Sequence, residues 1–176
     1  MRYQRHRQGR RAGSDVLNMS ILAEAASRLL RSRRLTRAPI WLYRARLGGL
    51  LGDRLLMLEH IGRHTGARRH VVLEVLEARG NPADRYIVAS GFGDRAQWFR
   101  NVTADPRVRV YAGGRAPAPA TARVLDQREA DRVLGDYIRR HPRTWEQFSA
   151  VLERTLGTPV SATDTALPMV ELRLDR

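Results

Sequence analysis

The chain of 176 residues contains no cysteine and no lysine, and aromatic residues make up only 6% of it. Without cysteine it can form no disulfide framework and no thiolate metal site, and it has no thiol nucleophile. No uncharged run reaches the roughly 18–20 residues that a membrane-spanning helix needs. Hydrophobic residues make up 43%, which is enough for a sizeable core. We therefore expect a single globular domain in a reducing, cytoplasmic environment.

Positive charge is concentrated at the start of the chain. The net charge is +14, and every basic residue is Arg. Residues 1–46 contain 12 Arg and 2 acidic residues, whereas residues 47–176 contain 20 Arg and 16 acidic residues. The larger part is thus only mildly basic. Nucleic-acid binding would depend on the charge of the front end alone, so we expect no specific nucleic-acid partner.

The first 52 residues predict two segments. Residues 1–18 are polar, Arg-rich and without period, which is typical of a basic disordered tail. Residues 19–52 indicate N-terminal helices, with an apolar stripe from Leu22 to Leu30 and a second helix beginning near Pro39. The apolar stretch before these helices is too short for a secretory signal. We expect one globular domain over 19–176, of which 53–176 is the cofactor-binding part.

From residue 54 the apolar pattern has period two, which is typical of strands. It predicts strands at 54–61, 69–77, 85–90, 107–112, 121–125 and 168–174. Helices are expected in a short segment carrying Trp98, after a capping box that begins at Asp126, and from about Thr144 to Leu156. Strands joined as hairpins, with helices inserted and at the ends, predict an α+β fold built on an antiparallel sheet or small barrel.

Hydrolytic and metal-binding motifs are missing. The chain has no nucleophile elbow, no Walker or Rossmann pattern, and no histidines at metal-ligand spacing with carboxylates, so we expect no metal site. His60 and His70 lie on neighbouring predicted strands and could meet across a hairpin. A polar pair at a sheet edge is the favoured interpretation of this pair.

Two segments carry binding chemistry. The turn from Gly62 to Arg69 holds four potential cations on a glycine-rich backbone, which suits a ligand with several negative charges or, alternatively, a solvated hairpin tip. The strand end Ala89–Gly93 precedes a helix that carries Trp98 and Phe99. Its glycines can hold a flat ring or an anion, while the two aromatic side chains can instead be core anchors.

These segments fall within a longer resemblance. GRHTGARR, then VASGFGDRAQWFRNVTADPRVRV, the helix ARVLDQREADRVLGDYIRRHPR and the terminal LPMVELRL are similar to the deazaflavin-dependent nitroreductase family. The match covers about residues 50–176. Several unrelated motifs occur in the order and at the spacing of that family.

The resemblance implies a split β-barrel with mainly antiparallel strands, and coenzyme F420 as the cofactor; flavin mononucleotide is the less favoured one. Arg63, His64, Thr65, Gly66 and Arg69 would line the anionic tail of F420. Ser90, Gly91, Phe92 and Gly93 would flank the deazaflavin ring, with Trp98 and Asn101 behind them. His64 stands where the family usually has Lys, and Gln97 directly precedes the tryptophan. No catalytic residue is implied, since the difficult chemistry resides in the cofactor.

The function expected is that of an F420H2-dependent oxidoreductase that passes a hydride to a small oxidised acceptor such as a quinone or a nitro compound. The alternative is a protein that binds a deazaflavin, flavin or tetrapyrrole without turnover. The resemblance also suggests a homodimer. For the basic front end, packing over the barrel mouth is favoured over peripheral contact with an anionic membrane.

Overall fold

The computed structural model describes residues 54–175. The predicted tail over 1–18 and the predicted helices over 19–52 lie outside the described residues, and both stay predictions. Within 54–175, no helix is long and apolar enough to cross a membrane.

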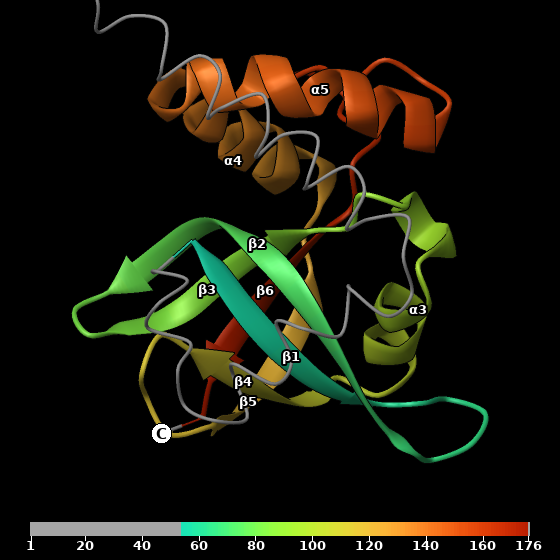
Figure 1. The fold of residues 1–176 in the computed structure, drawn as a ribbon, viewed down its shortest axis with the longest axis vertical. Helices are drawn as coiled ribbons and strands as arrows, with labels where there is room; N and C mark the ends of the chain where they lie inside the picture. Colours follow the sequence, from blue (N-terminus) through green and yellow to red (C-terminus); the bar gives the residue numbers. More distant parts are fainter. Residues whose placement is uncertain (1–53, 176) are drawn as a thin grey trace, which may run out of the picture. The chain divides into compact units, whose positions relative to one another are not determined.

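Six antiparallel strands form a closed barrel in the order β1-β2-β3-β6-β5-β4 (Figure 1). The strands are β1 (Leu55–Ile61), β2 (Arg68–Gly80), β3 (Ala83–Ala89), β4 (Arg107–Ala112), β5 (Ala118–Val124) and β6 (Met169–Leu174). Pairing of β1 with β4 closes the barrel, with Leu56 opposite Ala112 and Glu59 opposite Arg109. The predicted α+β split barrel of antiparallel strands is therefore confirmed.

The period-two pattern sorts side chains between the barrel interior and its outside. On β4, Val108 and Val110 are buried in the barrel core, whereas Arg107 and Arg109 are exposed. Every strand contributes apolar side chains to this first core, which also includes Trp98 from a helix. The interior is thus a packed core.

Within residues 54–175, four helical segments lie between strands. The short 3-10 helix η3 (Gly93–Arg95) leads into α3 (Gln97–Ala104), and both lie between β3 and β4. Helices α4 (Gln127–Arg140) and α5 (Pro142–Leu156) lie between β5 and β6. Figure 1 shows α4 between the barrel and α5.

Helix α4 packs on the outside of the barrel through the predicted apolar stripe. Asp126 accepts a hydrogen bond from the backbone N–H of Glu129, and Glu129 accepts one from the N–H of Asp126, which completes the predicted capping box. A second core joins α4 to β2, β3 and β6; it contains Ile87, Val133, Leu134, Tyr137 and Met169.

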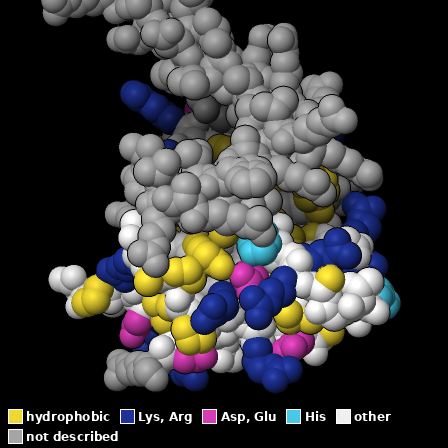
Figure 2. Space-filling model, turned by 60° about the horizontal axis from the view of Figure 1, so that its bottom comes forward, with side chains coloured by type: hydrophobic (Ala, Val, Ile, Leu, Met, Phe, Trp, Pro, Cys, Tyr) yellow, Lys and Arg dark blue, Asp and Glu magenta, His cyan; other side chains and the backbone are white. Residues whose placement is uncertain are grey.

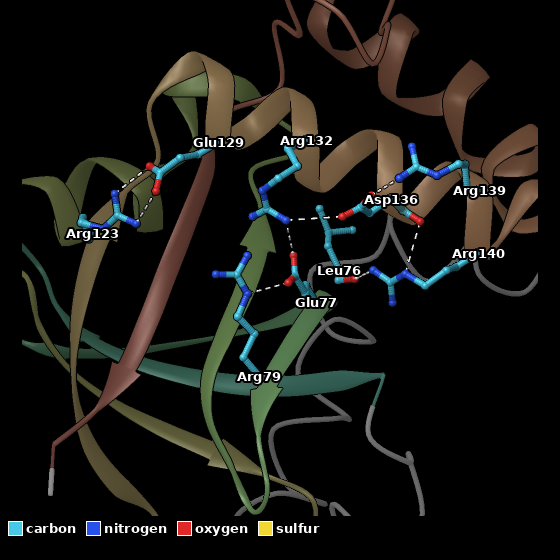
Figure 3. Close-up of polar contacts among 9 residues, drawn as sticks. All are labelled: Leu76, Glu77, Arg79, Arg123, Glu129, Arg132, Asp136, Arg139 and Arg140. Atoms are coloured by element: carbon cyan, nitrogen blue, oxygen red, sulfur yellow. Dashed lines mark hydrogen bonds and ion pairs between the residues drawn. The ribbon is translucent and has the colours of Figure 1, made fainter.

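Ion pairs surround this second core (Figure 3). On β2, Glu77 binds Arg79 at 2.5 Å and Arg132 of α4 at 3.6 Å. Arg132 continues to Asp136, which also contacts Arg139. On the other side, Arg123 of β5 reaches both carboxylate oxygens of Glu129, at 2.7 and 2.9 Å. These pairs fix the register of α4 against the barrel.

The strand and helix boundaries differ from the sequence prediction at a few points. Strand β2 continues to Gly80 and β5 already begins at Ala118, because barrel pairing extends strands beyond their apolar pattern. Helix α5 begins at Pro142 rather than at Thr144. Proline is favourable there since the first turn of a helix needs no partner for its missing N–H.

Glu129 predicts an acid-dependent part of the stability. Hydrogen bonds from Arg123 and from the backbone of Asp126 lower the pKa of Glu129 from 4.5 to about 2. A lowered pKa stabilises the fold above pH 4.5, and this contribution is lost as the pH falls toward 2. We expect E129Q to cost about 1 kcal/mol or less at pH 6, because the pair is partly exposed, and nearly nothing at pH 2.

Urea unfolding of the wild type and E129Q at both pH values measures this difference. E146Q, which changes an exposed carboxylate on α5, is the matched control. An E129Q effect that stays constant with pH would contradict the assignment.

Candidate functional site

The turn between β1 and β2 is built by its glycines. The N–H of Gly62 donates to the carbonyl of Ala67 at 2.9 Å, and the N–H of Gly66 donates to the carbonyl of Gly62 at 2.8 Å. A Cβ on Gly62 would lie 3.0 Å from Oγ1 of Thr65, and Gly66 has a φ of +64°. The backbone at Gly66 therefore favours glycine, and at Gly62 an added side chain would fit only tightly. In Figure 1 the turn projects beyond the barrel, below α3.

The basic side chains of the turn differ in their surroundings. His64, Arg68 and Arg69 are exposed, and Arg63 is half-buried. Arg68 lies 3.7 Å from Glu59. Among the described residues, neither Arg63 nor Arg69 forms an ion pair with a carboxylate, so both charges are available to an anionic ligand.

Arg63 is held by amide oxygens of α3. Its backbone N–H and its Nη1 donate to Oδ1 of Asn101, at 3.2 and 3.0 Å. Nη1 also donates to Oε1 of Gln97 at 3.1 Å. Amide acceptors fix a guanidinium without neutralising its charge. Gln97 was missed as a site residue, although its spacing of four from Asn101 places both on one face of a helix.

His60 lies on the inner side of this contact. It is 4% exposed, and its Nδ1 lies 3.1 Å from Nδ2 of Asn101. Burial lowers the pKa of His60, and the nearby His70 and Arg69 lower it further against the opposing effect of the Ile61 backbone. The imidazole is thus favoured in its neutral form.

His60 and His70 do not form a pair across the hairpin. His60 lies opposite Arg69 in the sheet register, and His70 lies opposite Glu59. Adjacent positions on a strand point to opposite faces, so the two rings are on different sides of the barrel wall. His70 instead contacts Glu59 at 3.2 Å, and the hydroxyl of Tyr111 donates to Glu59 at 2.8 Å.

Basic and acidic side chains lie close together on one face of the described residues. Figure 2, which brings the bottom of Figure 1 forward, shows Arg side chains on this face interspersed with acidic and hydrophobic ones. Within 54–175 no three His, Asp or Glu side chains are arranged to hold a metal ion.

The second predicted group forms a tight loop after β3. The hydroxyl of Ser90 donates to the carbonyl of Gly93 at 2.7 Å, and the N–H of Gly93 donates to the carbonyl of Ser90 at 2.8 Å. Ser90 is fully buried, and its own N–H donates to the carbonyl of Pro168 at 2.8 Å. The serine therefore fixes the shape of the loop.

The glycines of this loop make room for α5. A Cβ on Gly91 would lie 3.2 Å from Cδ2 of Leu152, and one on Gly93 would lie 3.1 Å from Cδ2 of Leu156. Between them, the side chain of Phe92 is 60% exposed. The loop thus lies against α5 and presents one aromatic side chain to solvent.

The sequence-predicted residues form two groups. Arg63 and Asn101 are in contact, and the turn that contains His64, Thr65, Gly66 and Arg69 adjoins them. Ser90, Gly91, Phe92 and Gly93 form the loop at α5. Trp98 is buried in the barrel core with Phe99 packed at its edge, so it anchors α3 from within. Arg100, whose Nε donates to the carbonyl of Asp94 at 2.8 Å, connects α3 back to η3.

Comparison with known protein families assigns the chain to one of them. The family model of the F420H(2)-dependent quinone reductase matches residues 35–163, well over half of the sequence. The chain belongs to this family. As a member of the F420H(2)-dependent quinone reductase family it is an oxidoreductase that uses coenzyme F420. A search of curated protein sequences found no match.

Similar solved structures include an F420-H2 dependent reductase, FDR-A, at 22% identity over 68% of this chain and 94% of that chain, with a TM-score of 0.47. A structure described as a domain-swapped dimer is 20% identical over 89% of this chain and 99% of that chain, with a TM-score of 0.49. A Clostridium acetobutylicum protein of the pyridoxinephosphate oxidase family is 8% identical over 76% and 83%, with a TM-score of 0.46.

The Arg-rich turn of this chain has the chemistry that the anionic tail of F420 would need. Uncompensated guanidinium groups at Arg63 and Arg69, with His64 beside them, are the donors that phosphate and carboxylate oxygens prefer. In the loop after β3, the space beside Gly91 and Gly93 is filled by leucine side chains of α5. Phe92 is the exposed apolar side chain of this loop.

Gly93 provides a test of the loop against α5. Both Gly93 and Gly157 have a positive φ, of 64° and 77°, but only a Cβ on Gly93 would meet a neighbour. We expect G157A to cost about 1–2 kcal/mol through backbone strain alone, and G93A to cost about 1 kcal/mol more through the contact with Leu156.

Urea unfolding of the single variants and of G93A combined with L156A measures the two parts. The double variant should cost less than the sum of its single variants, since the smaller side chain relieves the contact. Equal costs for G93A and G157A would show that α5 does not press on the loop.

Proposed function

We propose that this member of the F420H(2)-dependent quinone reductase family binds the tail of F420 on its Arg-rich turn and reduces a small oxidised acceptor, with quinones as the first class. The observation that carries the proposal is the fixation of Arg63 by two amide oxygens, which leaves its charge for a ligand. F420 carries a phosphodiester and glutamate carboxylates, as expected from the resemblance. Arg63, His64 and Arg69 would bind these groups, and Thr65 and Gly66 shape the turn.

The Ser90–Gly93 loop would hold the deazaflavin ring. In this proposal the exposed Phe92 side chain lies against the ring, while the buried Ser90 hydroxyl keeps the loop rigid. Trp98 anchors α3 in the barrel core and so positions Asn101. Bound F420H2 supplies a hydride, which together with a proton reduces a quinone to a quinol. The chain's part is to bind and orient both reactants.

Other parts of the sequence prediction stay predictions. These are nitro compounds as a second acceptor class, the homodimer, and contact of the basic N-terminal segment with an anionic membrane. Each concerns an acceptor, a second copy or residues that the described structure does not include.

Removal of the Arg63 side chain tests the tail site. We expect R63A to bind F420 about 10- to 100-fold more weakly, because a hydrogen bond to a charged group contributes about 1.5–3 kcal/mol. R69A should weaken binding in the same direction, and added salt should weaken wild-type binding more than that of either variant.

Calorimetric titration with oxidised F420, and in parallel with flavin mononucleotide, measures these affinities. R128A, which removes an exposed arginine of α4, is the matched control and should bind like the wild type. Tighter binding of flavin mononucleotide, or equal affinities of R63A and R128A, would contradict the proposed site.

Turnover separates an enzyme from a binding protein. With F420H2 in large excess over protein and a soluble quinone as acceptor, we expect many turnovers of deazaflavin oxidation per protein, followed by absorbance. A nitroaromatic compound in a parallel assay ranks the second acceptor class. Stoichiometric binding of F420H2 with no multiple turnover on either acceptor would favour the non-catalytic alternative.

A further inference from the structure

The buried imidazole of His60 has no role in the proposed site, although Asn101 connects it to Arg63 through hydrogen bonds. Nδ1 of His60 contacts Nδ2 of Asn101 at 3.1 Å, and Oδ1 of Asn101 accepts two hydrogen bonds from Arg63. The Arg-rich turn on the surface is thus connected to a buried histidine at the end of β1.

Donor and acceptor chemistry fixes the state of this histidine. Both groups of Arg63 that reach Asn101 are donors, so the amide must turn its oxygen toward Arg63 and its NH2 toward His60. The NH2 group can only donate. Nδ1 of His60 must therefore be the acceptor, which requires a neutral imidazole with its proton on Nε2.

We propose that His60 is a positioning residue for cofactor binding: its neutral Nδ1 holds the Asn101 amide in the orientation that fixes the Arg63 guanidinium. The inference rests on the proposed function, in which Arg63 binds the tail of F420. An Nδ1–H on His60 would face the NH2 of Asn101, and two donors cannot share one hydrogen bond. Asn101 would then turn its NH2 toward Arg63 and release the guanidinium.

The groups around His60 give this arrangement a pH dependence. On the neighbouring strand β2 lie Arg69, which is opposite His60, and His70. On β1 itself, Glu59 points to the opposite face of the sheet, where it binds His70 and Tyr111. From the turn comes Arg63, and α3 adds the uncharged Gln97 and Asn101. The described residues offer His60 no carboxylate partner, and burial lowers its pKa. Neutral His60 is therefore favoured at pH 7, and its protonation, which disrupts the arrangement, requires more acid than that of an ordinary histidine.

Protonation of His60 is expected to weaken binding of the anionic tail. His64 is a second histidine near this site and lies on the turn itself. The test is therefore made in an H64Q background, in which His64 no longer contributes.

Two substitutions separate hydrogen bonding from packing. In H60N the amide oxygen takes the place of Nδ1 and accepts from Asn101 at every pH, whereas H60L removes the acceptor. Calorimetric titration with oxidised F420 at pH 7.5 should give H60N an affinity within about threefold of the background, and H60L an affinity about tenfold weaker. Between pH 7.5 and 5 the background should lose affinity, and H60N should lose distinctly less.

A readout without ligand checks the tautomer. In ligand-free protein, the side-chain ¹⁵N shifts of His60 should report Nε2–H at pH 7.5. An Nδ1–H tautomer, or equal affinity and pH dependence of H60N and H60L, would overturn the inference while F420 binding stands. If H60L does not fold, the pH dependence of H60N alone decides. Absence of F420 binding by the wild type, with the Nε2–H tautomer present, would instead overturn the proposed function.

Discussion

The pairing of β1 with β4 is the contact on which the site depends. Because the two strands are antiparallel, with Glu59 opposite Arg109, the beginning of β4 lies beside the end of β1. Helix α3 directly precedes β4 along the chain, and the Arg-rich turn directly follows β1. Closure of the barrel therefore brings two segments that are 38 residues apart into hydrogen-bonding distance at Arg63 and Asn101.

Some arginines of this protein bind carboxylates, whereas Arg63 binds amide oxygens. Arg79, Arg107 and Arg123 bind carboxylates and stabilise local structure. Arg63 is held by the amide oxygens of Gln97 and Asn101 instead, and so keeps a charge that the described fold does not use. Net charge alone does not separate these two groups, since both contribute equally to a basic chain. The choice of acceptor around each guanidinium distinguishes a structural arginine from one available to a ligand.

The glycine loop after β3 shows how a binding motif and a packing requirement overlap. Ser90–Gly93 is the loop that we propose to hold the deazaflavin ring, yet the missing side chains of Gly91 and Gly93 also let α5 approach. A rigid loop exposes Phe92 because its backbone is fixed on one side by Ser90 and on the other by α5. The same glycines thus position a surface side chain through the packing behind it.

The sequence by itself determined the strands, the α4 capping box and the Arg-rich turn, because period-two alternation, end-capping and glycine turns are local properties. Several motifs in one order also indicated an F420-dependent oxidoreductase, and the family that the chain matches is that of the F420H(2)-dependent quinone reductases. Only the tertiary structure decided that His60 faces inward to Asn101 while His70 faces outward to Glu59, and that Gln97 joins the site. Those contacts depend on strand register and barrel closure. Both bring together residues that are far apart along the chain, and no repeating pattern in the sequence reports such contacts.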